Sequence, residues 1–213
     1  MLDPISPYGI SKLATEQIGK SYFNSGKIHV IIARIFIHVG TGGTDSLAIN
    51  QFCKQIAMAE RGLIEPTILH GNLETERDIT NSKDSAHAMI LLAEKGLPGQ
   101  AYNVGSGRTT SIANILSIAL SMARVKVVAK EDKSRFRTFD EKKLVANISK
   151  LQALTGWVPS PDIKDTVAEI LEHWRFKINN LYCRAAESAC KPLPSARAAN
   201  GTVFLGERSR GRM

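Results

Sequence analysis

The run HVIIARIF, from His29 to Phe36, is nearly continuous in apolar residues and rich in β-branched side chains. A strand covered on both faces of a parallel sheet has this composition, whereas a half-solvated strand alternates apolar and polar residues. Parallel strands need long crossover connections, which are usually helical. The run therefore predicts a buried parallel strand in an α/β protein.

Helical and strand patterns alternate on both sides of this run. An amphipathic helix is expected from Pro7 to the stop signal Asn24-Ser25-Gly26. Further helices are expected at 47–61, 84–95, 111–123, 149–154 and 162–175, and short strands at 66–70, 101–104 and 125–128. The charged stretch 131–143 is expected to be a surface loop. This order is typical of α/β architecture.

The formal net charge of +8 is unevenly distributed. Seven Lys or Arg and two acidic residues lie in 176–213, so this stretch carries more than half of the net charge. Basic and acidic residues are interspersed elsewhere, without the continuous basic stripe that a nucleic acid would need. We therefore expect one ordered domain over 1–175, a basic disordered tail over 176–213, and no nucleic-acid partner.

Other sequence features indicate a cytoplasmic protein. The three cysteines are too few and too scattered for a disulfide framework, and the N-terminus does not resemble a signal peptide. No apolar run approaches the roughly 18 residues needed to span a bilayer. The histidines lack paired metal-ligand spacing, so no metal and no membrane contact are expected.

Tyr8 and Lys12 form a Tyr-x-x-x-Lys pattern in the first expected helix. This spacing places both side chains on one face of a helix, one turn apart. An ammonium group beside a phenol favours the phenolate, which suits the pair to general acid/base catalysis. A solvated lysine one turn after a tyrosine would give the same pattern by chance.

The surroundings of this pair, SPYGISKLATE from Ser6 to Glu16, closely resemble the catalytic helix of extended short-chain dehydrogenases that act on nucleotide sugars, the NAD-dependent epimerase/dehydratase family. The likeness covers about residues 3–175 and includes RIFIH at 34–38, GNLETERD at 71–78, YNVGSG at 102–107, RFRTFD at 135–140 and TGWVP at 155–159. Within the family, these blocks look most like the branch of GDP-6-deoxy-mannose reductases and GDP-mannose 4,6-dehydratases.

The resemblance implies an NAD or NADP cofactor, a GDP-sugar substrate and a partial Rossmann-like sheet with a small α/β substrate-binding subdomain. Tyr8 would exchange a proton with the sugar, Lys12 would hold the nicotinamide ribose, and Ile35 and His38 would lie beside the cofactor. The implied substrate-binding positions are Ile37, Asn72, Arg77, Arg108, Arg137 and Asp140, with Arg135 projecting from the same loop. Family members are commonly homo-oligomers.

Three of these assignments have simpler alternatives. His38 can be a satisfied polar group, Arg77-Asp78 can be an internal surface pair, and the turn from Asn103 to Arg108 can need its glycines for geometry rather than for anion binding.

The chain also departs from the family pattern. It contains no Gly-x-x-Gly-x-x-Gly turn for the pyrophosphate, and Ile37 stands where the family has an asparagine. Thr138 replaces a usual proline, and Ala146-Asn147 replaces a usual Gly-Asp. We therefore expect an inactive C-terminal part of an enzyme, poorly soluble alone because the strand 29–36 would have an unpaired edge. A noncatalytic nucleotide-sugar binding or partner module is the main alternative, and a nucleic-acid binder acting through the tail is another.

Overall fold

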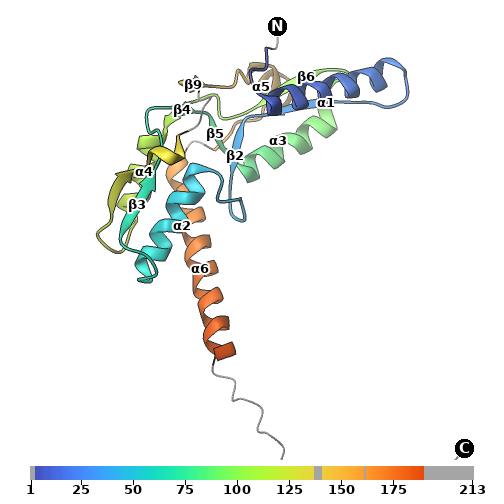
Figure 1. Ribbon diagram of the computed structural model, residues 1–213. Helices are drawn as coiled ribbons and strands as arrows, with labels where there is room; N and C mark the ends of the chain where they lie inside the picture. The colour runs from blue at the N-terminus through green and yellow to red at the C-terminus, as the bar shows by residue number, and fades with distance from the viewer. Residues whose placement is uncertain (1–2, 137–140, 161, 190–213) are drawn as a thin grey trace, which may run out of the picture.

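The computed structural model describes residues 3–136, 141–160 and 162–189, in which helices and strands alternate along the chain (Figure 1). The helices are α1 (Pro7–Asn24), α2 (Ala48–Glu60), α3 (Ser82–Lys95), α4 (Ile112–Ser121), α5 (Ser149–Thr155) and α6 (Ile163–Ala189), with a 3-10 turn η1 (Lys133–Arg135). The strands are β1 (Ile32–Ile35), β2 (Ile37–Val39), β3 (Thr67–His70), β4 (Glu76–Arg77), β5 (Ile79–Asn81), β6 (Ala101–Val104), β7 (Thr110–Ser111), β8 (Val128–Glu131) and β9 (Lys143–Leu144). The α/β class is confirmed.

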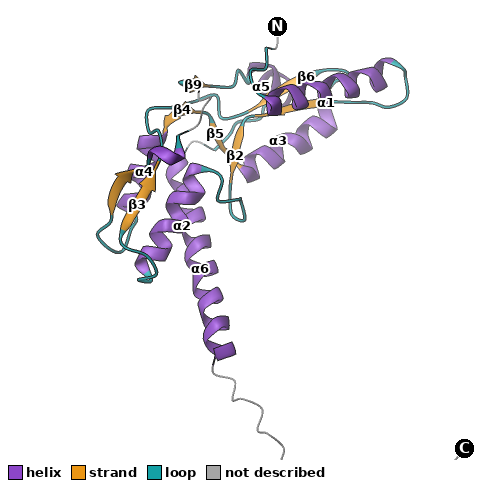
Figure 2. Cartoon of the chain, viewed as in Figure 1, coloured by secondary structure: helices purple, strands orange, loops and turns teal. Residues whose placement is uncertain are grey.

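Most strands pair in parallel. β1 pairs with β6, β2 with β5 and β3 with β8, all in parallel, while β4 lies parallel to β9 and antiparallel to β7. Each parallel pair is separated in the chain by at least one helix, as parallel pairing requires. Figure 2 shows the short strands lying among longer helices.

Two apolar clusters hold these elements together. The helical cluster joins α2, α4, α6 and β3, and its largest members include Phe52, Ile68, Ile115, Leu171 and Trp174. The sheet cluster joins α3, β6, α5 and the turn after α5, and includes Leu92, Tyr102, Val104, Leu151 and Trp157. α6 lies alongside α2 and extends beyond it (Figure 1). Of the helices described, none combines the length and the apolar composition needed to cross a membrane.

β1 is shorter and more exposed than the sequence predicted. It covers Ile32–Ile35 rather than His29–Phe36, and Ile35 is 36% exposed. A strand is buried on both faces only when neighbouring strands and helices enclose it. Within the described ranges β1 has one strand neighbour, β6, so the expected burial on both faces is not reached.

Two other elements, β8 and α6, differ from their predicted bounds by more than two residues. β8 begins at Val128, where the sequence predicted a strand to end, because parallel pairing places Val128 beside Thr67 and Glu131 beside His70. α6 continues beyond Arg175 to Ala189, so the first part of the expected tail is helical. Ile178, just beyond Arg175, is buried in the helical cluster, which stabilises this part of the helix. Residues 190–213 lie outside the described residues.

Candidate active site

Tyr8 and Lys12 lie side by side at the start of α1. The helix begins at Pro7, a favoured residue in the first turn, and the Ser6 hydroxyl oxygen accepts a hydrogen bond from the Gly9 N–H at 3.1 Å. The Lys12 ammonium nitrogen lies 5.2 Å from the centroid of the Tyr8 ring. Tyr8 is 72% exposed, which leaves its hydroxyl accessible to a ligand. The shared face expected from the Tyr-x-x-x-Lys spacing is therefore present.

Glu16 fastens this helix to β1. Arg34 on β1 donates from Nε to Oε2 of Glu16 at 2.8 Å and from Nη2 to Oε1 at 2.6 Å, and Lys20 donates to Oε1 at 2.7 Å. The hydrogen bonds from Arg34 and then Lys20 lower the pKa of Glu16 to about 2, against the opposing effect of burial. Glu16 is therefore a buried carboxylate that stays charged at neutral pH and holds α1 against the strand.

The residues expected beside the cofactor come from β1 and β2. Ile35 and His38 are both exposed, and His38 lies beside Thr80 in the pairing of β2 with β5. Successive side chains of a strand point to opposite faces, so Ile37 points away from His38. Ile37 is half-buried against the helical cluster. The isoleucine in the family's asparagine position thus contributes apolar packing and no hydrogen-bond donor.

Arg77 lies on β4, where it is buried rather than projecting into solvent. Its Nη1 donates to the carbonyl oxygens of Glu76 at 2.8 Å and Glu141 at 2.7 Å. The guanidinium therefore lies next to Glu141, at the end of the segment between η1 and β9. Arg137 and Asp140, two further predicted substrate contacts, belong to that segment and lie outside the described residues.

Asp78 follows Arg77 but binds backbone amides instead of forming a pair with it. Its carboxylate accepts hydrogen bonds from the N–H groups of Ser106 (2.6 Å), Gly107 (3.0 Å) and Ala146 (3.0 Å), and from the Ser106 hydroxyl (2.7 Å). Gly105 has no room for a side chain, because a Cβ there would lie 2.6 Å from the Cβ of Ala146 and 2.9 Å from the Asp78 carboxylate. The glycine-rich turn thus serves a buried aspartate, which already uses two of its amides.

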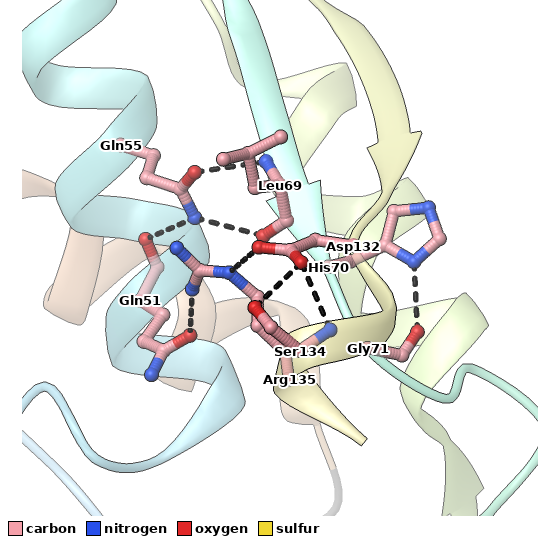
Figure 3. A network of polar contacts seen from close by, with 8 residues as sticks. All are labelled: Gln51, Gln55, Leu69, His70, Gly71, Asp132, Ser134 and Arg135. Carbon is pink, nitrogen blue, oxygen red and sulfur yellow. Dashed lines mark hydrogen bonds and ion pairs between the residues drawn. The ribbon is translucent and has the colours of Figure 1, made fainter.

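A polar network fixes the start of the charged loop (Figure 3). Arg135 donates from Nε to Asp132 at 3.1 Å and from Nη1 to Gln51 on α2 at 2.8 Å. Gln55, one turn further along α2, bonds both the N–H and the carbonyl of Leu69. The loop also approaches Gly71 closely, because a Cβ at Gly71 would lie 2.7 Å from the carbonyl oxygen of Arg135.

The two remaining predicted residues have local partners. Asn72 is half-buried, and its side-chain oxygen accepts from the Glu74 N–H at 2.9 Å. Arg108 is exposed, donates to the Ser160 carbonyl at 3.0 Å, and lines a cavity of about 220 Å³ together with Asn81 and Asp84. No other predicted site residue lines that cavity among the residues described.

The structure therefore brings Tyr8 and Lys12 into contact and ties them to the strand that leads to His38. Arg77 and Arg108 have partners elsewhere in the fold. Sequence reasoning missed the roles of Glu16, Arg34 and Asp78, although Arg34 interrupts an apolar strand and thereby signals a charged partner.

Comparison with known proteins gives a consistent result. A model of the GDP-mannose 4,6 dehydratase family matches residues 1–170. The GDP-6-deoxy-D-mannose reductase of Pseudomonas aeruginosa is 30% identical over 175 residues, which are 82% of this chain and 58% of the reductase. The structure of RMD from Pseudomonas aeruginosa complexed with NADPH superposes with a TM-score of 0.78 at 29% identity, covering 83% of this chain and 59% of that one.

A UDP-glucuronic acid 4-epimerase from Bacillus cereus, solved in complex with UDP-glucuronic acid and NAD, has the same fold. Its TM-score is 0.73 at 23% identity, with 83% of this chain and 55% of the epimerase covered. The chain spans little more than half the length of these relatives. With the family model matching most of its residues, the chain belongs to the GDP-mannose 4,6-dehydratase family of NAD-dependent epimerases and dehydratases.

Proposed function

We propose that the chain is the C-terminal part of an NAD(P)-dependent enzyme that modifies a GDP-sugar, of the GDP-6-deoxy-mannose 4-reductase or GDP-mannose 4,6-dehydratase type. The observation that carries this proposal is the contact between the exposed Tyr8 phenol and the Lys12 ammonium, 5.2 Å from its ring centroid. The 30% identity to a GDP-6-deoxy-D-mannose reductase favours the GDP-sugar branch.

Tyr8 is the proposed proton donor and acceptor. In the reducing direction, Tyr8 gives its proton to the keto oxygen of the sugar while hydride adds to the carbonyl carbon. The Lys12 ammonium, 5.2 Å from the ring centroid, is the proposed counter-ion of the phenolate that remains. In the oxidising direction, the phenolate takes the proton from the sugar hydroxyl.

The residues around Tyr8 fit the nicotinamide end of NAD(P). The exposed Tyr8 and Lys12 offer a hydroxyl and an ammonium to a ribose, while Ile35 offers an apolar surface and His38 a ring that can donate or accept a hydrogen bond. The bound cofactor supplies or accepts the hydride.

The proposed GDP-sugar grip uses arginines near the charged loop. Arg137 is the proposed diphosphate ligand, with Asp140 near the nucleoside ribose, and the buried Arg77 is proposed to support this site through its hydrogen bond to the Glu141 carbonyl. The planar guanidinium fork matches phosphate oxygens. Gln51 and Asp132 hold Arg135 where the chain enters this segment.

Calorimetric titration of a dilute sample tests the proposal. We expect GDP-mannose to bind more tightly than UDP-glucose, and NADPH to bind weakly because the chain contains no glycine-rich pyrophosphate turn. Tyr8→Phe should leave the GDP-mannose affinity unchanged, since the diphosphate supplies most of the grip. Failure of every nucleotide sugar to bind would contradict the proposal.

A noncatalytic nucleotide-sugar binding module is the second candidate. A module of this kind would bind GDP-mannose but would not gain NADPH affinity when a dinucleotide-binding half is added as a separate polypeptide. An enzyme part would gain that affinity.

A further inference from the structure

Four polar side chains follow one line along α1 at intervals of four residues: Tyr8, Lys12, Glu16 and Lys20. Residues four apart are neighbours on a helix, so Glu16 has one lysine a turn before it and another a turn after it. Glu16 pairs with Lys20, at 2.7 Å. The Lys12 ammonium instead lies over the Tyr8 ring and has no ion-pair partner among the residues described.

Helix geometry alone favours Lys20 only slightly, because a glutamate that precedes its lysine by four residues pairs somewhat better than the reverse order. Arg34 adds a stronger bias. Its fork engages both oxygens of Glu16, with Nε on Oε2 and Nη2 on Oε1. Glu16, Lys20 and Arg34 together carry one negative and two positive charges, so the cluster has no attraction for a third cation.

The cluster of Glu16, Lys20 and Arg34 is partly shielded from water, which strengthens the interactions between its charges. The Glu16 side chain is 7% exposed, and charges shielded from water interact more strongly than charges on an open surface. An incompletely paired Glu16 in this place would attract the nearest free cation, and Lys12 is one helical turn away. The contact of Lys12 with Tyr8 therefore depends on what else binds Glu16.

We propose that Arg34 is a positioning residue for the acid/base pair: by occupying both oxygens of Glu16, it leaves the Lys12 ammonium beside the Tyr8 phenol. Arg34 acts through Glu16 and is not itself a catalytic residue. The inference rests on the proposed function only in assigning an acid/base role to Tyr8 and Lys12. Its test needs no nucleotide, so its outcome is independent of the GDP-mannose titration.

The test follows the Lys12 side chain by NMR in a dilute chain labelled with ¹³C at the lysine ε carbons. The NMR signal of a group over an aromatic ring is shifted upfield. The Tyr8→Ala variant gives the chemical shift of the Lys12 signal without this ring effect. Lys12→Arg assigns the signal. We expect Arg34→Gln to lose the upfield shift, because Glu16 then draws Lys12 away from the ring. Removing the carboxylate charge as well, in Glu16→Gln/Arg34→Gln, should restore the shift.

Two further variants separate positioning from simple support of the fold. Lys20→Gln should keep the shift, since Arg34 still engages both oxygens. Arg34→Lys retains a cation beside Glu16 and should keep more of the shift than Arg34→Gln. An unchanged Lys12 signal in Arg34→Gln would overturn the proposal. Loss of the shift in the double variant would overturn it too, because Arg34 would then support the helix in a way unrelated to the charge of Glu16.

Discussion

Arg34 on β1 and Glu16 on α1 form a two-pronged ion pair, with Nη2 to Oε1 at 2.6 Å and Nε to Oε2 at 2.8 Å. α1 presents most of its other side chains to solvent, and Glu16 is its buried residue. The pair joins the helix that carries Tyr8 to the strand that leads to His38. An ion pair therefore attaches α1 to the sheet, whereas most surface helices are attached by an apolar stripe that packs on the core.

Glu16→Gln should lower the free energy of unfolding by about 2 kcal/mol at neutral pH, because Arg34 would lose its charged partner. The pKa of Glu16 is lowered to about 2, so its stabilisation is fully present above the ordinary glutamate pKa and is lost as the pH falls toward 2. We expect urea unfolding at a series of pH values to give a constant difference in unfolding free energy between Glu16→Gln and wild type above about pH 5. Below about pH 5 this difference should shrink. A difference that grows on acidification would contradict the assignment.

Asp78→Ala should be more damaging, lowering the free energy of unfolding by about 3 kcal/mol or more, because several amides would lose their acceptor in a buried site. Asp78 is 1% exposed and accepts from Ser106, Gly107 and Ala146. Asp132→Ala removes a carboxylate near the surface and should change the unfolding free energy little. Equal effects of the two variants in urea unfolding would count against the structural role of Asp78.

Ile178→Ala tests whether α6 beyond Arg175 belongs to the folded core. Ile178 is 5% exposed within the helical cluster, so we expect a loss of about 2 to 4 kcal/mol in unfolding free energy. Phe176→Ala is the matched control, because Phe176 is 69% exposed on the same helix. Chemical denaturation of both variants measures the difference. A neutral Ile178→Ala would show that the core ends at Arg175.

Local signals predicted much of this fold. Ser6 and Pro7 mark the start of α1, and the four-residue run 101–104 is a strand with the predicted bounds. Contacts between distant residues were harder to predict. The start of β8 is set by pairing with β3, and the burial of Ile178 in the helical cluster stabilises α6 just beyond Arg175.

The candidate site divides in the same way. The Tyr8–Lys12 contact follows from the four-residue spacing in a helix, which can be read directly from the sequence. The pairing of Glu16 with Arg34 joins residues on two elements, and Asp78 reaches amides in two separate loops. Spacing along the chain cannot predict either contact, because a folded sheet has to bring the partners together.

Tyr8→Phe should abolish most activity of the enzyme formed when the chain is combined with a dinucleotide-binding half. Losing the proton donor should reduce kcat about 10²- to 10⁴-fold with little change in KM. Tyr22→Phe is a close control, because Tyr22 lies on the same helix, is 48% exposed and has the Lys27 ammonium 5.9 Å from its ring centroid. Steady-state kinetics with matched folding spectra would decide. Equal rates for the two variants would rule out Tyr8 as the acid/base.

The chain alone should self-associate as its concentration rises. Among the described residues β1 has a strand neighbour only in β6, and Ile10 and Ile18 of α1 are 56% and 59% exposed. Unpaired edges and exposed apolar faces promote association. Sedimentation velocity should show larger species with increasing concentration. Ile18→Lys should reduce these species, whereas Val158→Lys, at another exposed apolar position, should not.

A dinucleotide-binding half supplied as a second polypeptide should convert the mixture into one defined complex, because it would cover the β1 edge. A chain that stays monomeric at every concentration would show that this edge and the outer face of α1 need no partner.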